Sequence, residues 1–420
     1  MSGTRAIMTG RTESTGSAPV PRVPLLDPED DSPLERDSPH SLRGAGPGRW
    51  PIVAGIPFLR TGREALRRDA LAALDVGEGR AALIMLLADQ DDYARTPPPD
   101  ATALGRLVAA VDDGSASLRD AMAALGFGPV ADYFAHRWSA PTYLSGLALL
   151  ERHWSEGAAV VEVACGIGHF LRDLALRGVP ALGVDVVFAK LWLARRLVVP
   201  PVVGLVCGDA SAGLPLGRAA RLTLAFCHDA FYFLPDKPRV VAGLQRLVGD
   251  PGRILIGHAH NSEFDHRGVA GEPRTPAEYS ALLPGCRLYD DAELARSAWA
   301  GEAAGPRLPS ELAGVEAVAI VWDPPGRPAA VMERGPGLDR PRPGAALRLN
   351  PILADGEGLL RPRWPSTRFE AEYAAESPYL SGEPTPRIPL PHRVAASGEV
   401  EAEVGRLARR RILLDLPERW

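Results

Sequence analysis

The chain has 420 residues, enough for two domains or for one large domain with extensions. Its formal net charge of -5 at pH 7 provides no general attraction to nucleic acid or to an anionic membrane surface. The chain opens with no basic and apolar leader, and it contains no run of about 18 apolar residues. We therefore expect a cytoplasmic protein that binds neither nucleic acid nor membranes.

The cysteines indicate a reducing compartment and no zinc site of their own. None of the four belongs to a C-x-x-C pair, so we expect no metal ligands among them. Three fall in or just after predicted buried strands, where a free thiol behaves as a small apolar group. The four are Cys165, Cys207, Cys227 and Cys286.

The N-terminal third is predicted to be a tail followed by a helical region. Residues 1–48 are rich in Pro, Ser, Gly and charge, so we expect them to be disordered. Residues 49–155 open with Trp50 and "PIVAGIPFL", a short extended segment, and then show apolar residues at three- and four-residue spacing. The spacing predicts helices over 63–76, 79–92, 101–112, 116–125 and 140–154.

From Ala159 onward, short β-branched runs alternate with amphipathic stretches. This alternation is typical of an α/β domain with a parallel sheet covered on both faces. A polar, Pro-rich insertion near 260–310 follows, and then 314–323 and 328–335 predict a terminal hairpin around "PPGR". The expected strands are 159–164, 180–184, 202–207, 221–227 and 252–259, with helices at 168–177, 187–197 and 236–248.

Residues 336–420 carry many prolines and scattered aromatic residues. We expect a loop-rich extension that ends in one amphipathic helix within "EVEAEVGRLARRRILLDL". The α/β domain is thus predicted to span 156–335.

The stretch "VVEVACGIGHF" places Gly166 and Gly168 between the first strand of this domain and its helix. In open α/β sheets, ligands bind beyond the carboxyl ends of the strands, and glycine lets the backbone approach them closely. Dinucleotide sites use G-x-G-x-x-G, but the third position here is Leu171. A dinucleotide is therefore the less favoured ligand.

Acidic residues end the next three strands. Asp185, Asp209 and Asp229 follow successive strands, and His228 precedes the last of them. The carboxyl ends of parallel strands meet at one edge of a sheet, so these groups are predicted to lie around one site. A carboxylate at Asp185 can accept both hydroxyls of a ribose.

The stretch from about 158 to 260 resembles the class I S-adenosylmethionine-dependent methyltransferases, especially the small-molecule enzymes of quinone biosynthesis. Glu162, Gly166 and Gly168 match the first motif of that family, Asp185 its ribose-binding acid and Asp209 with Ala210 its adenine-contacting pair; Ala164 stands where the family has glycine. The resemblance implies a Rossmann-like, seven-stranded, mostly parallel sheet and S-adenosylmethionine as the cofactor. It implies these cofactor-binding residues: Glu162, Ala164, Cys165, Gly166, Gly168, Asp185, Val186, Asp209, Ala210, Cys227, His228 and Tyr143.

Such enzymes transfer the methyl group by in-line displacement onto a small-molecule acceptor. Alignment is then the main task of the protein, and a general base is optional. His228 is the predicted base and Asp229 its partner; alternatively, His228 packs against the cofactor. Tyr232 is a weaker candidate, and Arg137 or Tyr143 could bind the methionine carboxylate.

His258 and His260 follow the fifth strand, two residues apart. They could contact the substrate or bind a metal ion, but the sequence shows no carboxylate partner for them. We therefore predict no metal ligands.

The segment "RWPIVAGIPFL" resembles the strand-like tail of the small zinc-binding activator subunits of tRNA and release-factor methyltransferases, without their zinc cysteines. It indicates a strand that packs against the catalytic domain. Two alternatives to a methyltransferase remain, a nicotinamide-dependent oxidoreductase and a non-catalytic binding protein. The sequence does not decide the oligomeric state or the methyl acceptor.

Overall fold

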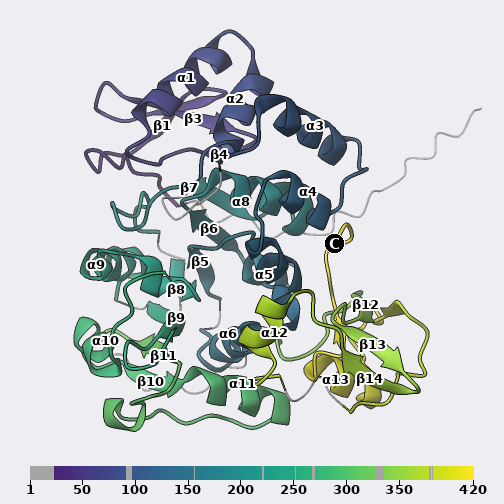
Figure 1. The fold of residues 1–420 in the computed structure, drawn as a ribbon. Helices are drawn as coiled ribbons and strands as arrows, with labels where there is room; N and C mark the ends of the chain where they lie inside the picture. Colours follow the sequence, from purple (N-terminus) through teal and green to yellow (C-terminus); the bar gives the residue numbers. More distant parts are fainter. Residues whose placement is uncertain are drawn as a thin grey trace, which may run out of the picture.

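A seven-stranded sheet forms the centre of the molecule (Figure 1). The computed structural model describes residues 23–90, 97–155, 157–219, 222–250, 252–266, 270–326, 335–377, 380 and 382–420. The strand order is β10-β11-β9-β8-β5-β6-β7. The strands are β5 (Ala159–Val163), β6 (Ala181–Asp185), β7 (Gly204–Cys207), β8 (Leu222–His228), β9 (Arg253–His260), β10 (Arg287–Asp290) and β11 (Ala317–Trp322).

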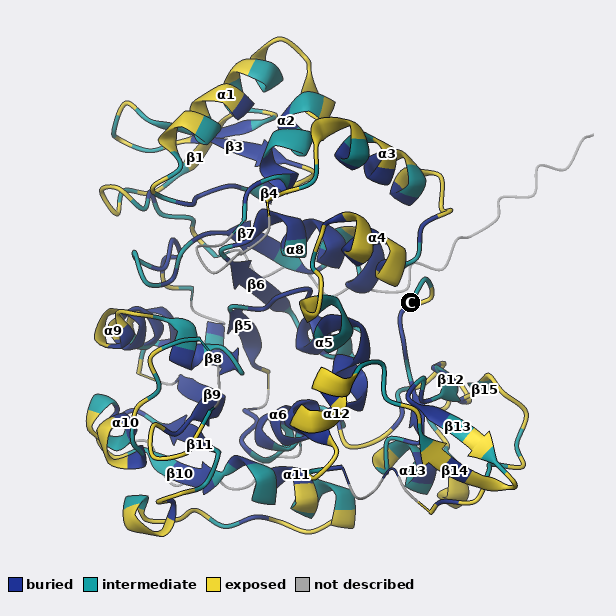
Figure 2. Cartoon of the chain, viewed as in Figure 1, coloured by how far each residue is buried: buried dark blue, intermediate teal, exposed yellow. Residues whose placement is uncertain are grey.

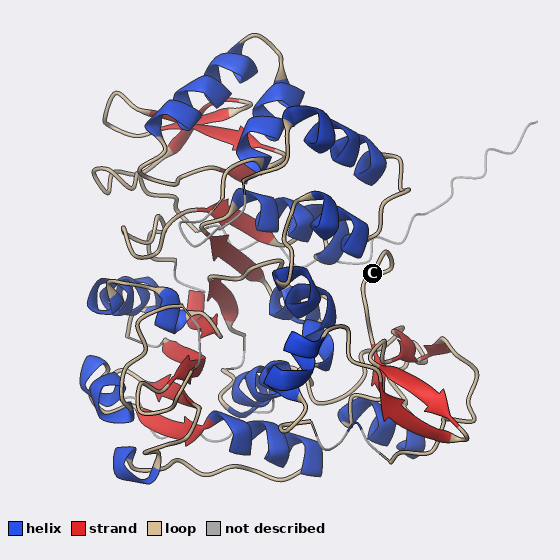
Figure 3. Ribbon diagram, viewed as in Figure 1, coloured by secondary structure: helices blue, strands red, loops and turns tan. Residues whose placement is uncertain are grey.

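The five strands from β9 to β7 are parallel, and β11 and β10 continue the sheet in antiparallel pairing. This is the predicted Rossmann-like α/β fold. Successive side chains of a strand point to opposite faces, and Val160 and Val161 accordingly belong to different apolar clusters. Helices cover both faces, so every residue of β5 is buried (Figures 2 and 3).

One face of the sheet packs against α6 (Pro141–Arg152), α7 (His169–Ala175), α8 (Phe188–Leu193) and α11 (Asp291–Ala300). The opposite face packs against α9 (Lys237–Val248) and α10 (Pro276–Leu282). Among the described residues, no helix has the length and apolar character needed to cross a membrane.

The outer strands differ from the predicted hairpin. β11 forms where expected, but its partner is β10, which lies in the segment predicted to be an irregular insertion. Leu288 and Tyr289 of β10 are both buried, one toward each face, and a four-residue strand is too short to show this alternation in the sequence. The expected second strand at 328–335 lies almost wholly outside the described residues.

The N-terminal region begins with a sheet, where the composition predicted a disordered tail. β1 (Glu35–Ser38), β2 (Ser41–Arg43), β3 (Arg49–Val53) and β4 (Ile56–Pro57) form an antiparallel four-stranded sheet. Tertiary contacts order this polar segment: the indole of Trp50 donates to Asp27 Oδ2 at 3.0 Å, and Leu26 donates to the carbonyl of Pro215 at 3.1 Å. Residues 1–22 lie outside the described residues.

This N-terminal sheet leads directly into the central one. Phe58 forms a parallel bridge with Cys207 of β7, so this segment packs against the α/β domain as predicted. Among the described residues, five helices follow before α6, the last helix ahead of the central sheet. They are α1 (Glu64–Asp75), α2 (Gly79–Leu87), α3 (Ala101–Asp112), α4 (Leu118–Ala124) and α5 (Val130–His136), and all but α5 were predicted.

The C-terminal extension has more regular structure than its prolines suggested (Figure 1). It has its own apolar core, to which Phe369 and Tyr373 of α12 belong, and the ring of Phe369 lies 5.9 Å from that of His136 on α5. The predicted C-terminal helix is present as α13. The elements are β12 (Ala346–Leu349), β13 (Leu353–Gly356), β14 (Leu359–Pro362), α12 (Thr367–Tyr373), β15 (His392–Arg393), α13 (Ala402–Arg409) and β16 (Leu413–Leu414).

Candidate functional site

The turn between β5 and α7 has the backbone conformation that its glycines predict. Gly166 and Gly168 have φ angles of 56° and 79°, in the left-handed region where glycine is unstrained. A Cβ atom at Gly166 would lie 3.0 Å from the ring of Phe134, and one at Gly168 would lie 2.8 Å from Val199. Ala164 also has a left-handed φ of 56°, so it adopts a strained conformation at the position where the family has glycine.

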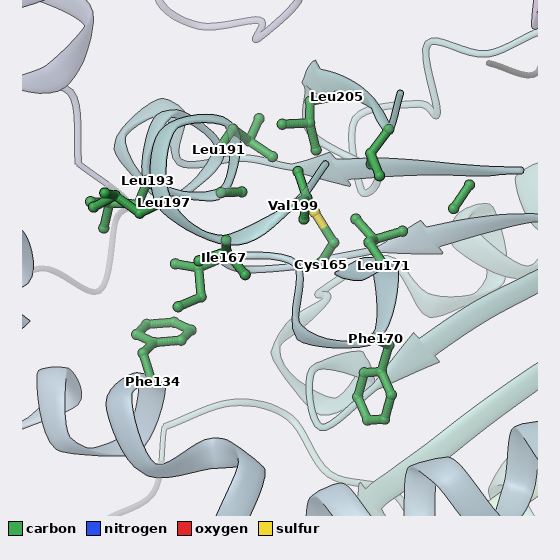
Figure 4. Close-up of a cluster of buried hydrophobic side chains, with 14 of the residues drawn as sticks. Phe134, Cys165, Ile167, Phe170, Leu171, Leu191, Leu193, Leu197, Val199 and Leu205 are labelled. Atoms are coloured by element: carbon green, nitrogen blue, oxygen red, sulfur yellow. The ribbon is translucent and has the colours of Figure 1, made fainter. Parts of the chain in front are cut away.

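Apolar side chains surround this turn (Figure 4). Phe134 comes from α5, and Ile167 and Leu171 belong to the same buried cluster. The thiol of Cys165 is buried, and burial raises its pKa. Its sulfur packs so close to Gly183 that a Cβ there would lie 2.7 Å away. Cys165 therefore offers a ligand its backbone and not its side chain.

Glu162 is a buried acid beside the turn. Its side chain is 4% exposed, and Oε2 has no hydrogen-bond partner among the described residues. Burial raises the pKa of this carboxyl to about 8. A buried carboxyl with an unsatisfied oxygen suits a cationic or hydrogen-bond-donating ligand group.

Asp185 supports the turn from the neighbouring strand. Its Oδ2 accepts the N–H of Gly166 at 2.8 Å, and its Oδ1 accepts the N–H of Val187 at 2.9 Å. Each carboxylate oxygen keeps a further lone pair for a hydroxyl donor. Val186, the residue between these positions, accepts the Cys207 thiol through its carbonyl at 3.5 Å.

Asp209 follows β7 at the same edge of the sheet. It is half-buried, and its Oδ1 accepts the N–H of Ser211 at 2.8 Å. Ala210 is buried beside it. Cys227, by contrast, is fully buried within β8.

Tyr143 lies on α6 and faces α7. Its ring stacks on Phe170 with centroids 4.6 Å apart, and its hydroxyl donates to Asp173 Oδ2 at 2.7 Å. The residue is fully buried. These contacts describe a helix-packing residue, so its predicted contact with the cofactor is not supported by the geometry.

His228 ends β8 beneath α6. Its Nε2 lies 2.6 Å from the carbonyl of Thr142, and a Cβ on Gly257 would lie 2.1 Å from its Nδ1. Burial, with the nearby charge of Arg137, lowers the pKa of His228 to about 4. The imidazole is therefore neutral at pH 7, and its Nε2–H donates a hydrogen bond to the Thr142 carbonyl.

Asp229 is the centre of a polar cluster at the ends of β8 and β9. Its Oδ2 accepts Arg137 Nη1 at 2.6 Å and the Tyr133 hydroxyl at 2.8 Å. Its Oδ1 accepts the Tyr232 hydroxyl at 3.1 Å. Burial alone would raise the pKa of Asp229, but Arg137 and the nearby His258 hold it well below its usual range.

Asp291 adds a second carboxylate to this cluster. It lies in the first turn of α11, and its Oδ2 is 2.8 Å from His258 Nδ1. Burial alone would lower the pKa of His258, but Asp229 and Asp291 raise it to about 9. The fold thus supplies the carboxylates that the sequence did not show near the His258–His260 pair.

Sequence analysis missed Tyr133 and Asp291. Asp291 follows Asp290, whose side chain caps α11, and in the sequence both acids resemble ordinary helix-start residues. Tyr133 reaches Asp229 because α5 packs across the strand ends, and no sequence pattern indicates that placement.

Residues 161–256 match a family model described as a methyltransferase domain. The matched segment runs from β5 into β9 of the central sheet. S-adenosyl-L-methionine is bound in a solved structure of phosphoethanolamine N-methyltransferase 2 of Haemonchus contortus, to which part of this chain is similar. The search of curated proteins found no match for this sequence.

Solved methyltransferase structures resemble parts of the chain. A TehB-like S-adenosylmethionine-dependent methyltransferase from Corynebacterium glutamicum is 18% identical, covers 47% of this chain and 100% of its own, and has a TM-score of 0.33. Phosphoethanolamine N-methyltransferase 2 of Haemonchus contortus is 14% identical; the match covers 50% of this chain and 60% of that enzyme, with a TM-score of 0.34. A third structure is the complex of the Haloferax volcanii Trm112 activator with a methyltransferase. One of its chains is 18% identical; the match covers 36% of this chain and 67% of that chain, with a TM-score of 0.30.

The residues of the methyltransferase domain fit this cofactor in two respects. The unsatisfied Oε2 of Glu162 can receive a donor such as the ammonium of the methionine moiety. Gly166 has no side chain of its own, and the ring of Phe134 fills the space beside it, so a ligand would reach this main chain only with the ring displaced. Glu162, Gly166, Gly168, Asp185 and Asp209 are the residues that would hold it.

Proposed function

We propose that the protein is an S-adenosylmethionine-dependent methyltransferase that transfers a methyl group to a small-molecule acceptor. The observation that carries the proposal is the position of Glu162 with its unsatisfied Oε2 beside the glycine turn, inside the segment matched by the family model. The bound cofactor supplies an electrophilic methyl group. The residues of the chain supply alignment, through the glycine turn and Asp185.

A small-molecule acceptor is favoured by charge and by burial. The net charge of -5 does not attract nucleic acid. The strand-four segment "CHDAF" lacks the Asn/Asp-Pro-Pro-Tyr/Phe motif of enzymes that methylate exocyclic amines of bases or glutamine. Asp229, which follows β8, is bound by Tyr133 of α5, and His258, near the end of β9, is buried and bound by Asp291 of α11.

The roles of His228 and Asp229 as base and partner stay predictions. The contact of His228 Nε2 with the Thr142 carbonyl supports a positioning role, in which the imidazole fixes α6 over the strand ends. Asp229 is held by three donors and is better placed to organise the acceptor site.

Titration calorimetry with S-adenosylmethionine, its demethylated product and NAD tests the cofactor. We expect the first two to bind and NAD not to bind. Asp185→Asn should weaken cofactor binding about 10- to 100-fold, because a buried hydrogen bond to a charged group contributes about 1.5–3 kcal/mol. Asp69→Asn, on an exposed part of α1, is the matched control. Unchanged affinity in Asp185→Asn would refute the ribose assignment.

Turnover separates the roles of the polar residues. Formation of the demethylated cofactor, measured across a panel of phenol, carboxylate and amine acceptors, identifies the acceptor class. If His228 only positions α6, the His228→Gln variant should retain turnover. If His228 is the base, the variant should lose the turnover that the wild type shows at pH values above the pKa of His228.

A non-catalytic binding protein is the second candidate, and the packing of Phe134 on Gly166 is the observation in its favour. In that case neither S-adenosylmethionine nor its product would bind to the full chain. Phe134→Ala would then restore cofactor binding if the ring alone blocks the turn.

A further inference from the structure

Asp229, His258 and His260 meet at the carboxyl ends of β8 and β9. One ligand atom from each residue lies within 4.8 Å of the other two. Two imidazoles and one carboxylate suit borderline divalent cations such as Zn²⁺, Co²⁺ and Fe²⁺. We propose that these three residues form a binding site for a divalent transition-metal cation of this kind.

The first support is the way His258 is held. Asp291 Oδ1 accepts the backbone N–H of His258 at 3.0 Å, and Asp291 Oδ2 accepts Nδ1 at 2.8 Å. Ser145 donates to the same Oδ2 at 2.8 Å. A carboxylate behind one imidazole nitrogen fixes the ring and leaves the other nitrogen for a metal.

That other nitrogen faces Asp229 across a gap. His258 Nε2 lies 4.0 Å from Asp229 Oδ1, which is too far for a hydrogen bond. Arg137 and Tyr133 bind Oδ2, so Oδ1 retains capacity for a further partner beside the Tyr232 hydroxyl. A cation between the two atoms would satisfy both.

His260 supplies the second observation that points to a ligand. It is 6% exposed, and its Nδ1 has no hydrogen-bond partner among the described residues. Its ring is stacked between Tyr232, at 3.7 Å, and His266, at 4.1 Å. A buried nitrogen without a partner is unfavourable unless a ligand satisfies it.

The backbone at two of the ligands is strained. Asp229 and His258 have left-handed φ angles of 54° and 48°, a conformation that is uncommon outside glycine, although Asp and His adopt it more often than other side chains. Val318 pairs with Ala259 while Ile320 pairs with Ile256, so Gly257 and His258 form a bulge on β9. Bulges and positive φ angles are concentrated at functional sites, where they redirect side chains.

Charge and geometry both admit a dication. A bound metal ion displaces the proton of His258. With both imidazoles then neutral, the carboxylates of Asp229 and Asp291 and the guanidinium of Arg137 sum to one negative charge. Bonds of about 2 Å in a tetrahedral site place ligand atoms roughly 3.3 Å apart, so the distances between ligand atoms would shorten by up to about 1.5 Å. Three protein ligands leave one coordination position for water or for an acceptor atom.

Cobalt titration of the full-length protein, after dialysis against a chelator, tests the site. We expect one Co²⁺ per chain with visible absorption bands of nitrogen and oxygen ligands and no thiolate charge-transfer band. Zn²⁺ should displace the cobalt. His258→Gln and His260→Gln should each weaken Co²⁺ binding at least 100-fold, and Asp291→Asn about 10- to 100-fold.

His392→Gln, on β15 in the extension, is the matched control and should bind Co²⁺ as the wild type does. Circular dichroism shows which variants are folded. Absence of stoichiometric Co²⁺ binding to the wild-type chain would overturn the proposal, whether or not the variants fold. Unchanged binding in both histidine variants would overturn it as well. Because absorption is the readout, the result does not depend on methyl transfer.

Discussion

The backbone N–H of Leu59 lies 2.7 Å from the carbonyl oxygen of Cys207. This hydrogen bond joins the N-terminal sheet to the free edge of β7, so the segment after β4 continues the central sheet. Edge strands present unpaired backbone groups, and covering this edge satisfies some of them. The N-terminal region is therefore joined to the central sheet by backbone pairing.

Phe58→Ala should detach this segment. Phe58 is fully buried and packs edge-on against Phe188 of α8, with ring centroids 6.3 Å apart. We expect a loss of about 3–5 kcal/mol in the free energy of unfolding, because a large buried ring is removed. Urea denaturation measures the loss, and faster hydrogen exchange at the Leu59 amide locates it. Phe264→Ala, at a residue 41% exposed, should change little.

Glu162→Gln should change how stability depends on pH. The folded-state pKa of Glu162, about 8, is above the unfolded value, so the folded protein binds the proton more tightly. The resulting contribution to stability is fully present below about pH 4.5 and is lost as the pH rises through 8. The glutamine variant does not lose this contribution. Its free energy of unfolding should therefore exceed that of the wild type by about 2–4 kcal/mol at pH 9 and by much less at pH 5.

Melting curves from pH 5 to pH 9 measure the difference between Glu162→Gln and the wild type. Glu302→Gln, on an exposed turn, is the control and should follow the wild type throughout. Parallel curves for Glu162→Gln and the wild type would contradict the assigned pKa.

Ala164→Gly should stabilise the protein by about 0.5–1 kcal/mol. Relief of the left-handed strain at φ 56° outweighs the greater flexibility of glycine in the unfolded chain. The same change at Ala109, an exposed position within α3, should instead destabilise by roughly 1 kcal/mol. Chemical denaturation distinguishes the two signs, and a loss of stability at both positions would argue against strain at Ala164.

Arg137→Met should destabilise the protein by about 3–5 kcal/mol, because it leaves the buried carboxylate of Asp229 without its ionic partner. The double variant Arg137→Met with Asp229→Asn should recover part of this loss. Urea denaturation of the single and double variants measures the coupling. Arg68→Met, at an exposed ion pair on α1, should stay within about 0.5 kcal/mol of the wild type. Additive effects at Arg137 and Asp229 would contradict the coupling.

Local patterns predicted much of the fold. The strand–helix alternation from Ala159 to His260 predicted the five parallel strands, and the spacing of Gly166 and Gly168 predicted the turn that follows the first. These signals are local, because hydrophobic period and glycine conformation depend on neighbouring residues. Short elements escaped detection: β10 has four residues, and its pairing with β11 depends on residues far along the chain.

By itself, the sequence determined the succession of strands and helices from Ala159 to His260 and which acids follow successive strands, since periodicity and turn chemistry are properties of adjacent residues. Only the tertiary structure decided that α5 and α11 bring Tyr133 and Asp291 to the strand ends. It also decided that His228 is held by a backbone carbonyl while His258 faces Asp229. The physical reason is that a side chain acquires its charge and its partners from the elements packed against it, and these elements are distant in sequence.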